Sequence, residues 1–158
     1  MDDLSGLFRP DRVAVVGSTP REGSIGRAIT ANLLSGFDGE VVPVNPNHES
    51  VLGRPCVPTV GEAGDVDLAV VVVPAEVAVS VLREAGEAGV PNAVVITAGF
   101  GEVGDAGAAM EDELTAVAEE YGMALVGPNS LGIASTPVGL NATFAPSAPR
   151  EGSISMLS

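Results

Sequence analysis

Three glycines, Gly17, Gly23 and Gly26, lie in a loop that follows a short run of apolar residues at positions 12–17. Glycine adopts positive φ readily and lets backbone N–H groups come close to a ligand. The residues after this loop have the pattern of a helix, whose N-terminus supplies unpaired amides and the positive end of the helix dipole. The spacing of these residues therefore indicates a binding site for a phosphate group.

The loop matches neither of the two best-known phosphate motifs. The dinucleotide fingerprint has its second glycine two residues after the first, where this chain has Thr19, and an acid after the second strand, where this chain has Asn45 and Pro46. A P-loop needs a lysine before its Ser or Thr, and all seven basic residues here are arginines. The missing glycine and the missing acid argue against NAD, and the missing lysine excludes a P-loop nucleotide site.

The single cysteine, Cys56, and the single histidine, His48, offer little further chemistry. One cysteine cannot form an internal disulfide, and one Cys with one His cannot supply a zinc site. His48 lies on the far side of a loop and is no base for Cys56, which we interpret as a packed residue. The sequence thus predicts no catalytic residue and no metal site.

Acidic residues outnumber basic ones by 21 to seven, giving a formal net charge of −14. Such a charge argues against binding to nucleic acid or to an anionic membrane. Because the acids are scattered and lysine is absent, we favour adaptation to a salt-rich cytoplasm over an acidic partner-binding face; in molar salt the Debye length is only about 3 Å. No apolar run approaches the ~18–20 residues of a membrane span, and the N-terminus is acidic where a secretory signal is basic. We therefore expect a halophilic, cytoplasmic protein.

The phosphate loop must be positioned by a sheet, and the sequence indicates one α/β domain over residues 1–158. Apolar runs predict strands at 12–17, 40–45, 67–73, 92–97 and 123–126. Apolar periodicity predicts helices at about 24–37, 75–89 and 107–121. This alternation predicts right-handed βαβ units, and hence a Rossmann-like parallel sheet with helices on both faces.

Individual residues refine this prediction. Ser24 can cap the first helix, and Pro43 places its strand nearer the edge of the sheet. We expect Val77, Val81, Leu82 and Ala85 to face inward from the helix at 75–89. Residues 1–12 are interpreted as a lead-in, residues 133–152 as an extended or looped excursion, and residues 153–157 as a last strand. Because this strand would fall on the last residues of the sequence, we expect the chain to be the N-terminal domain of a longer enzyme.

In a parallel sheet a ligand binds across the carboxyl ends of the strands. Four of these ends carry turns with small residues, proline or glycine, at 17–26, 45–46, 73–74 and 97–99. Such turns are also what any α/β fold requires. Their coincidence with a phosphate loop at the start of a helix favours a nucleotide crevice.

Eight blocks of sequence make a family resemblance specific: VVGS (15–18), GSIG (23–26), VPVNP (42–46), VLGRP (51–55), DLAVVVVP (67–74), ITAGF (96–100) with Glu102, GPNSLG (127–132) and GLNATF (139–144). Nearly end to end, the chain resembles the N-terminal CoA-binding domain of the nucleoside-diphosphate-forming acyl-CoA synthetases, the superfamily of the succinyl-CoA synthetase α subunit. It looks most like the ADP-forming acetate–CoA ligase branch. Bacterial protein acetyltransferases carry a similar domain.

The resemblance implies coenzyme A as the ligand and assigns it a set of contacts. Expected along the diphosphate are Gly17, Ser18, Thr19 and Pro20, helped by Arg21, Ser24 and Gly26. Expected beside the adenosine and its 3′-phosphate are Asn45, Pro46 and the neighbourhood of His48. The groove is expected to be lined by Val73 and Pro74. The pantetheine arm is expected to meet Ile96, Thr97 and Ala98, and the thiol end to lie near Asn129. Some relatives have a lysine near the 3′-phosphate; a neutral imidazole is a weaker partner, so contact by His48 stays open.

The family reaction is acyl-CoA + ADP + phosphate ⇌ acid + CoA + ATP, through an acyl phosphate and a phosphorylated histidine. In the family that histidine and the ATP-grasp domain lie in other parts of the enzyme, and His48 matches no phosphohistidine motif. We therefore expect this chain to bind CoA and to catalyse nothing alone. Two alternatives remain: a CoA-sensing regulatory module, free-standing or attached to an acetyltransferase, and an NAD-type dinucleotide-binding domain.

Overall fold

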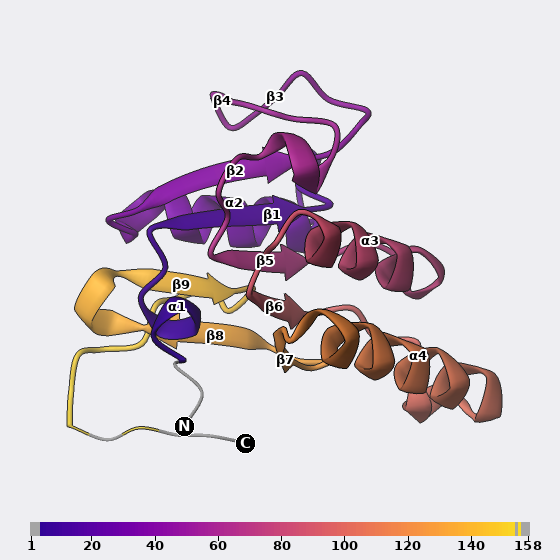
Figure 1. Cartoon of the computed structure of the whole chain (residues 1–158). Helices are drawn as coiled ribbons and strands as arrows, with labels where there is room; N and C mark the ends of the chain where they lie inside the picture. The colour runs from indigo at the N-terminus through magenta and orange to yellow at the C-terminus, as the bar shows by residue number, and fades with distance from the viewer. Residues whose placement is uncertain (1–3, 154, 156–158) are drawn as a thin grey trace.

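The computed structural model describes residues 4–153 and 155, and it has a five-stranded parallel sheet at its centre (Figure 1). The strands are β1 (Arg12–Val16), β2 (Glu40–Val44), β5 (Leu68–Val71), β6 (Asn92–Val95) and β7 (Ala124–Val126). Their order across the sheet is β2-β1-β5-β6-β7. The five strands expected between residues 12 and 126 are present, and β2 with its Pro43 lies at an edge, as predicted.

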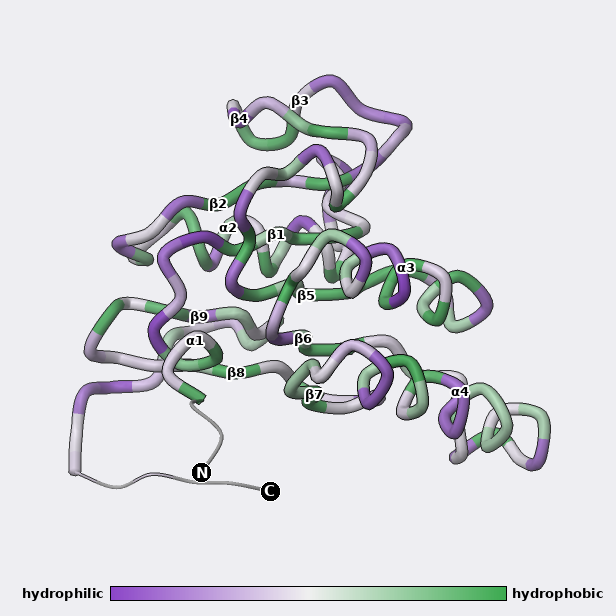
Figure 2. Tube along the Cα trace, viewed as in Figure 1, coloured by the Kyte–Doolittle hydropathy of each residue, from purple (hydrophilic) through white to green (hydrophobic). Residues whose placement is uncertain are grey.

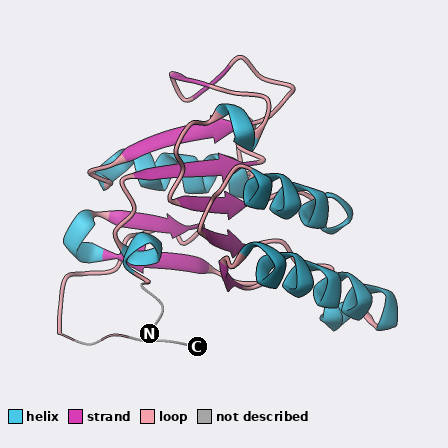
Figure 3. Cartoon of the chain, in the orientation of Figure 1, coloured by secondary structure: helices cyan, strands magenta, loops and turns pink. Residues whose placement is uncertain are grey.

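Helices cover both faces of this sheet, as the sequence predicts (Figure 3). Side chains alternate along each strand, so Ala14 and Val16 of β1 face the pair α3 (Ala75–Glu87) and α4 (Asp105–Tyr121). Val13 and Val15 face the opposite way, toward α2 (Ile25–Gly36). The central strands are accordingly the apolar centre of the molecule (Figure 2), because both of their faces are buried.

A β-hairpin lies beside α2 on the second face, where the sequence suggested only an extended or looped excursion. Its antiparallel strands are β8 (Gly132–Ser135) and β9 (Leu140–Thr143), joined through the short helix η3 (Thr136–Val138). Ile133, Leu140 and Ala142 of the hairpin are buried against the sheet. The strands are too short, and too rich in small and polar residues, to give a clear period-2 pattern.

The remaining elements are short. Helix α1 (Ser5–Phe8) inserts Leu7 into the core. A small hairpin of β3 (Ser50–Val51) and β4 (Arg54–Pro55) follows β2 and leads to η1 (Val60–Glu62), and η2 (Gly101–Val103) precedes α4.

Two expectations about these regions differ from the structure. Val77 is exposed, because Ala78 takes the inward position on α3. The last strand expected at 153–157 lies largely outside the described residues, and Ser153 and Ser155 are not in a strand.

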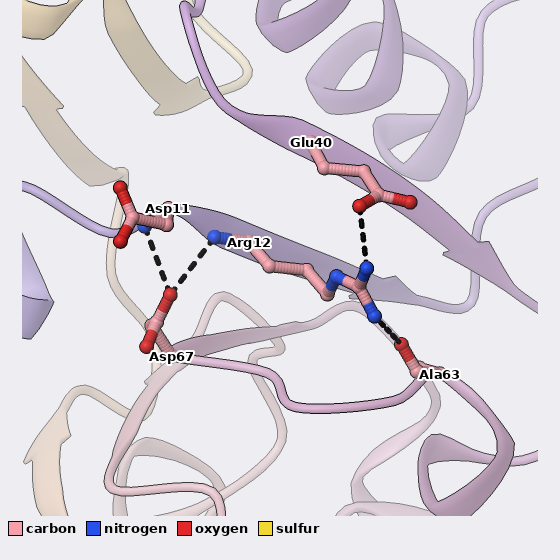
Figure 4. A network of polar contacts seen from close by, with 5 residues as sticks. All are labelled: Asp11, Arg12, Glu40, Ala63 and Asp67. Atoms are coloured by element: carbon pink, nitrogen blue, oxygen red, sulfur yellow. Dashed lines mark hydrogen bonds and ion pairs between the residues drawn. The ribbon is translucent and has the colours of Figure 1, made fainter.

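The amino ends of three neighbouring strands are joined by a polar network (Figure 4). One carboxylate oxygen of Asp67, just before β5, accepts hydrogen bonds from the backbone amides of Asp11 and Arg12, both at 2.9 Å. The guanidinium of Arg12 donates to the carbonyl of Ala63 at 3.0 Å and pairs with Glu40 of β2 at 2.6 Å. These contacts fix the relative positions of β1, β2 and β5 at the edge opposite the predicted site.

Candidate functional site

Successive strands are added to the sheet in one direction from β1 and in the other direction from β5. This change of direction places a crevice at the carboxyl ends of β1 and β5. From β1 the chain moves to β2 on one side, and from β2 it crosses back to β5 on the other side. Loops at such a switch point diverge, and ligands of open α/β sheets bind in the space between them. The loop after β1 is the glycine loop, so the phosphate motif lies at this crevice.

A cleft of about 650 Å³ opens at this edge. It contains seven of the residues that the sequence assigned to CoA: Arg21, Val73, Pro74, Ile96, Thr97, Ala98 and Asn129. A smaller hollow of about 350 Å³ adjoins it along α2 and includes Ser24. The structure therefore brings together predicted residues from four separate segments of the chain.

The glycine loop packs directly on the first turn of α2. The Ser24 side chain caps this helix by accepting a hydrogen bond from the amide of Arg27 at 3.3 Å, as predicted. The amides of Ile25 and Gly26 have no hydrogen-bond acceptor within the part of the chain that the structure describes. Gly26 lies so close to the loop that a β-carbon would clash with the carbonyl of Gly17. The helix N-terminus can thus offer unpaired amides to an anion.

Ser18, which is expected along the diphosphate, ties the glycine loop to α2. Its side chain is fully buried, with its hydroxyl 2.7 Å from the hydroxyl of Thr30, which itself donates to the carbonyl of Gly26. These bonds tie the loop to α2 from inside. The backbone of Ser18 is paired as well, because its amide donates to the carbonyl of Val15 at 3.4 Å and its carbonyl accepts from Asn45 at 2.9 Å.

The loop after β2 is joined to the glycine loop but lies outside the cleft. The side-chain amide of Asn45 donates to the carbonyl of Ser18 at 2.9 Å, and the hydroxyl of Thr19 lies 3.2 Å from Nε2 of His48. Pro46 is exposed beside them. Arg54, in the small hairpin after β2, lines a separate groove with Arg12 and Glu40.

Thr97 connects the loops on the other side of the cleft. Its hydroxyl donates to the carbonyl of Val73 at 2.6 Å, and its own carbonyl accepts from the amide of Asn129 at 2.9 Å. The hydroxyl of Ser130 donates to the carbonyl of Val95 at 3.1 Å. The carboxyl ends of β5, β6 and β7 are thereby held as one wall.

Carboxylates hold the next part of the same loop. Glu102 accepts hydrogen bonds from the amides of Gly99 and Phe100, and Glu111 of α4 accepts from the amide of Gly101 at 3.0 Å. The bond from Gly99, above all, lowers the pKa of the Glu102 carboxyl below its ordinary range. These amides are paired within the chain, which fixes the backbone just after Ala98.

A family model described as CoA binding domain matches residues 11–136. The chain belongs to this family. It is 48% identical to an ADP-forming acetate–CoA ligase I of Archaeoglobus fulgidus over 98% of its own length, but it covers only 23% of that relative. It is 41% identical to the α subunit of an ADP-forming acetate–CoA ligase I of Pyrococcus furiosus, covering 35% of it.

Solved structures agree with this membership. An acetyl-coenzyme A synthetase 1 of Candidatus Korarchaeum cryptofilum, in complex with phosphate and ADP, superposes with a TM-score of 0.88 at 45% identity. The match covers 92% of this chain and 32% of that one. This CoA-binding domain therefore spans between about a fifth and a third of the length of the relatives it matches.

Five cleft residues of this CoA-binding domain were missed among the predicted contacts: Ile25, Val72, Ser130, Leu131 and Phe144. Leu131 and Phe144 belong to the GPNSLG and GLNATF blocks, which were recognised as motifs without a role for these side chains. Their convergence depends on the hairpin, and the hairpin had not been predicted. The other three lay beside assigned residues: Ile25 next to Ser24, Val72 next to Val73 and Ser130 next to Asn129.

Other chemistry is sparse in the part of the chain that the structure describes. Burial raises the pKa of the Cys56 thiol, which lies 3.6 Å from the carbonyl of Asn45. No group of three or more His, Cys, Asp or Glu in residues 4–153 and 155 is placed to hold a metal ion. Nor does any helix within these residues have the length and apolarity needed to cross a membrane.

Proposed function

We propose that this domain binds coenzyme A across the carboxyl edge of its sheet, with the diphosphate at the glycine loop and the pantetheine arm in the cleft. The single observation that carries this proposal is the position of the 650 Å³ cleft. It begins at the N-terminus of α2 and ends at the loop after β7, so the proposed phosphate site and the channel for the pantetheine arm would be continuous. The edge spans four strand spacings, about 19 Å, which suits an extended ligand.

The order of the loops suggests the direction in which CoA lies. The loop after β2, with Asn45, Pro46 and His48, would take the adenosine and its 3′-phosphate. The loop after β1, with Gly17, Thr19 and Pro20, would take the diphosphate together with Arg21. The wall around Thr97 would take the pantetheine arm, with Asn129 near the thiol. Nε2 of His48 already lies 3.2 Å from the hydroxyl of Thr19. A phosphate would therefore either meet both side chains together or replace Thr19 as the partner of His48.

Long-range attraction cannot drive this binding, because both the phosphates of CoA and the chain are negative, the chain by 14 charges. The attraction must therefore be local, and it would come from the unpaired amides, the helix dipole and Arg21. Short hydrogen bonds survive in molar salt, whereas repulsion between distant charges is screened. We therefore propose a protein of a salt-rich cytoplasm whose CoA affinity holds or rises with added KCl.

At the level of the whole enzyme, we propose that the domain serves an ADP-forming acyl-CoA ligase. The ligases named above support this, since the chain matches a part of each. The acyl-phosphate and phosphohistidine chemistry would then belong to other domains or subunits, including an ATP-grasp domain. The chain alone would bind CoA without turnover.

The decisive experiment is thermal melting and calorimetric titration with CoA, dephospho-CoA and NAD. Ligand at 100 times its Kd should raise the stability by about 2.7 kcal/mol, or roughly 5–10 °C in Tm for a domain of this size. We expect CoA to produce this shift and NAD to produce none. No stabilisation by either CoA or dephospho-CoA would refute the proposal, and stabilisation by NAD alone would favour a dinucleotide site.

A matched pair of variants tests the position of the site. Ala98 is exposed in the cleft, and Ala109 is exposed on α4 outside it. Ala98→Glu should abolish the CoA shift, because it puts a carboxylate in the channel for the pantetheine arm. Ala109→Glu adds the same charge and should leave the CoA shift intact. Equal effects of the two variants would show that net charge, rather than the cleft, controls binding.

A further inference from the structure

A buried pair of hydroxyl groups lies directly behind the glycine loop. The buried residues of α2 are Gly26, Ile29, Thr30 and Leu33, and Thr30 alone among them has a polar side chain. Its hydroxyl lies 2.7 Å from that of Ser18, and neither residue has any exposed surface. An apolar residue at position 30 would complete the face of α2 that packs on the sheet. Packing in the core therefore does not explain the hydroxyl of Thr30.

The hydrogen bonds of this pair have a definite direction. The hydroxyl of Thr30 donates to the carbonyl of Gly26, one helical turn before it, at 2.7 Å. Because a hydroxyl has only one proton to donate, Ser18 must be the donor in the bond between the two side chains. The bonds therefore run from Ser18 of the glycine loop through Thr30 to the first turn of α2. Without Thr30, the buried hydroxyl of Ser18 would have no acceptor within the described residues.

The hydroxyl pair joins two segments that both carry unpaired amides. On the helix, the amides of Ile25 and Gly26 have no acceptor in the described part of the chain, and on the loop the same holds for the amide of Thr19, next to Ser18. Gly26 lets the two segments touch, because a β-carbon at this position would clash with the loop backbone. The spacing between the two groups of amides thus depends on how closely Thr30 holds the loop.

The bond from Thr30 to its own helix is by itself ordinary. Threonine often donates to the carbonyl four residues before it, and this bond does not stabilise the helix. Thr115 of α4 makes the same bond to the carbonyl of Glu111 at 3.0 Å, on the exposed surface. What distinguishes Thr30 is its second partner, which comes from another segment. A buried polar pair with all its bonds made favours one arrangement of the segments that carry it.

We propose that Thr30 is a positioning residue for the diphosphate of CoA. Thr30 is fully buried and would not touch the ligand. Through Ser18 it holds the glycine loop against α2, so that the amide of Thr19 and those of Ile25 and Gly26 bind one diphosphate together. This inference rests on the proposed function. Breaking the bond between Thr30 and Ser18 should therefore weaken the binding of every ligand that carries the diphosphate.

Three single variants, measured by calorimetry and thermal melting, test the positioning. Thr30→Val leaves the buried hydroxyl of Ser18 without an acceptor, so the Tm should fall and the Kd for CoA should rise at least about tenfold. Ser18→Ala breaks the same bond but leaves no donor unpaired. It should weaken CoA binding to a similar degree with a smaller change in Tm. Thr30→Ser keeps both hydroxyls and should bind CoA within about twofold of the unaltered chain.

The double variant Ser18→Ala/Thr30→Val separates positioning from stability. Replacing both partners of a buried hydrogen bond by apolar groups is nearly neutral for stability, so the Tm should recover most of the loss seen in Thr30→Val. The CoA affinity should stay as low as in the single variants, because both substitutions remove the same bond. Recovery of the affinity together with the Tm would make Thr30 merely structural. If Thr30→Val does not fold, this double variant decides the question alone.

Two further measurements locate the effect at the diphosphate. Dephospho-CoA, which lacks the 3′-phosphate, should lose affinity in Thr30→Val by the same factor as CoA; a smaller loss would assign the effect to the 3′-phosphate and overturn the inference. At saturating CoA, the NMR shifts that CoA causes at the amides of Ile25 and Gly26 should be reduced in Thr30→Val, while that at Thr97 is kept. An equal reduction at Thr97 would show a general distortion. Thr115→Val is the matched control and should change none of these quantities.

The outcomes separate this inference from the proposed function. If the unaltered chain binds no CoA, the proposed function fails. If it binds CoA, and Thr30→Val or the double variant binds CoA equally tightly, the role of Thr30 is refuted and CoA binding stands.

Discussion

The two edges of the central sheet are both tied together by side-chain hydrogen bonds, but they use charge differently. At the amino edge, Arg12 lies between Glu40 and the carbonyl of Ala63, and Asp67 binds two backbone amides. At the carboxyl edge, the bonds between loops come from neutral groups such as Asn45 and Thr97. Neither of the two ion pairs within the described residues lies at the carboxyl edge: Arg12–Glu40 is at the amino edge, and Arg83–Glu120 joins α3 to α4.

This difference follows from what each edge must do. At the amino edge, a paired charge joins neighbouring strands. The hydrogen bonds to its partners offset the cost of removing it from water. A carboxylate pairing at the other edge would compete with, or repel, an anionic ligand. Neutral bonds fix the loops there without adding a field, so the unpaired amides at the start of α2 remain available. Stability and ligand binding should therefore respond separately to changes at the two edges.

Removing the Asp67 carboxylate should have the largest effect, and only on stability. Asp67→Ala leaves the amides of Asp11 and Arg12 without their acceptor, and hydrogen bonds to charged groups are worth about 1.5–3 kcal/mol. We expect the free energy of unfolding in urea to fall by about 3 kcal/mol, with the Kd for CoA unchanged under folding conditions. Asp65→Ala, at a nearby exposed acid, should be nearly neutral. A weaker CoA affinity in Asp67→Ala would show that the edges are coupled.

A small change at the other edge should act mainly on binding. In Gly26→Ala the new β-carbon would clash with the carbonyl of Gly17, and forcing such contacts costs about 1–3 kcal/mol. The glycine loop must then move away from the helix N-terminus, so we expect CoA affinity to fall at least about tenfold. In Gly61→Ala the β-carbon meets open space, and calorimetry should find its affinity unchanged. Normal CoA binding by Gly26→Ala would remove the glycine loop from the site.

Sequence reasoning reached the fold and part of the site for identifiable reasons. The five buried strands have continuous apolar runs, and the turns after them carry Gly, Pro or Asn, so the sheet and its carboxyl edge were predictable. The family resemblance then added residues such as Asn129 to the cleft. The hairpin of β8 and β9 was not predictable from periodicity, and Phe144 depends on it.

Side-chain direction was the other thing that sequence could not supply. Ser18 was expected along the diphosphate without a prediction of where its side chain lies, and its hydroxyl lies inside against Thr30. Both orientations fit a small polar residue after a strand, and only packing against α2 distinguishes them. The bonds of Thr97 to Val73 and Asn129 join segments about 24 and 32 positions away, which no local pattern reveals.

Glu102 is a carboxylate at the carboxyl edge, where neutral groups join the loops. It should therefore give the smallest measurable effect among these changes. Its charge is bound by the amides of Gly99 and Phe100. While these bonds are made, Glu102 is consistent with a carboxyl edge that presents no free negative charge to the ligand. Since these bonds lower its pKa in the folded chain, they contribute stability above the ordinary pKa of about 4.3. That contribution is lost as the pH falls through the lower, folded value.

Glu102→Gln should therefore loosen the loop by a small amount at neutral pH and by nothing in strong acid. Amide hydrogen exchange, read by NMR, should be a few-fold faster at Gly99 and Phe100 between pH 6 and 8, with a slightly lower Tm. The Tm difference from the unaltered chain should vanish as the pH falls well below about 4.3, because the carboxyl of Glu102 is then protonated too. Glu119→Gln, on the exposed face of α4, should change neither quantity. If Glu102→Gln instead tightened CoA binding without altering exchange, the carboxylate would be acting as a free charge against the ligand.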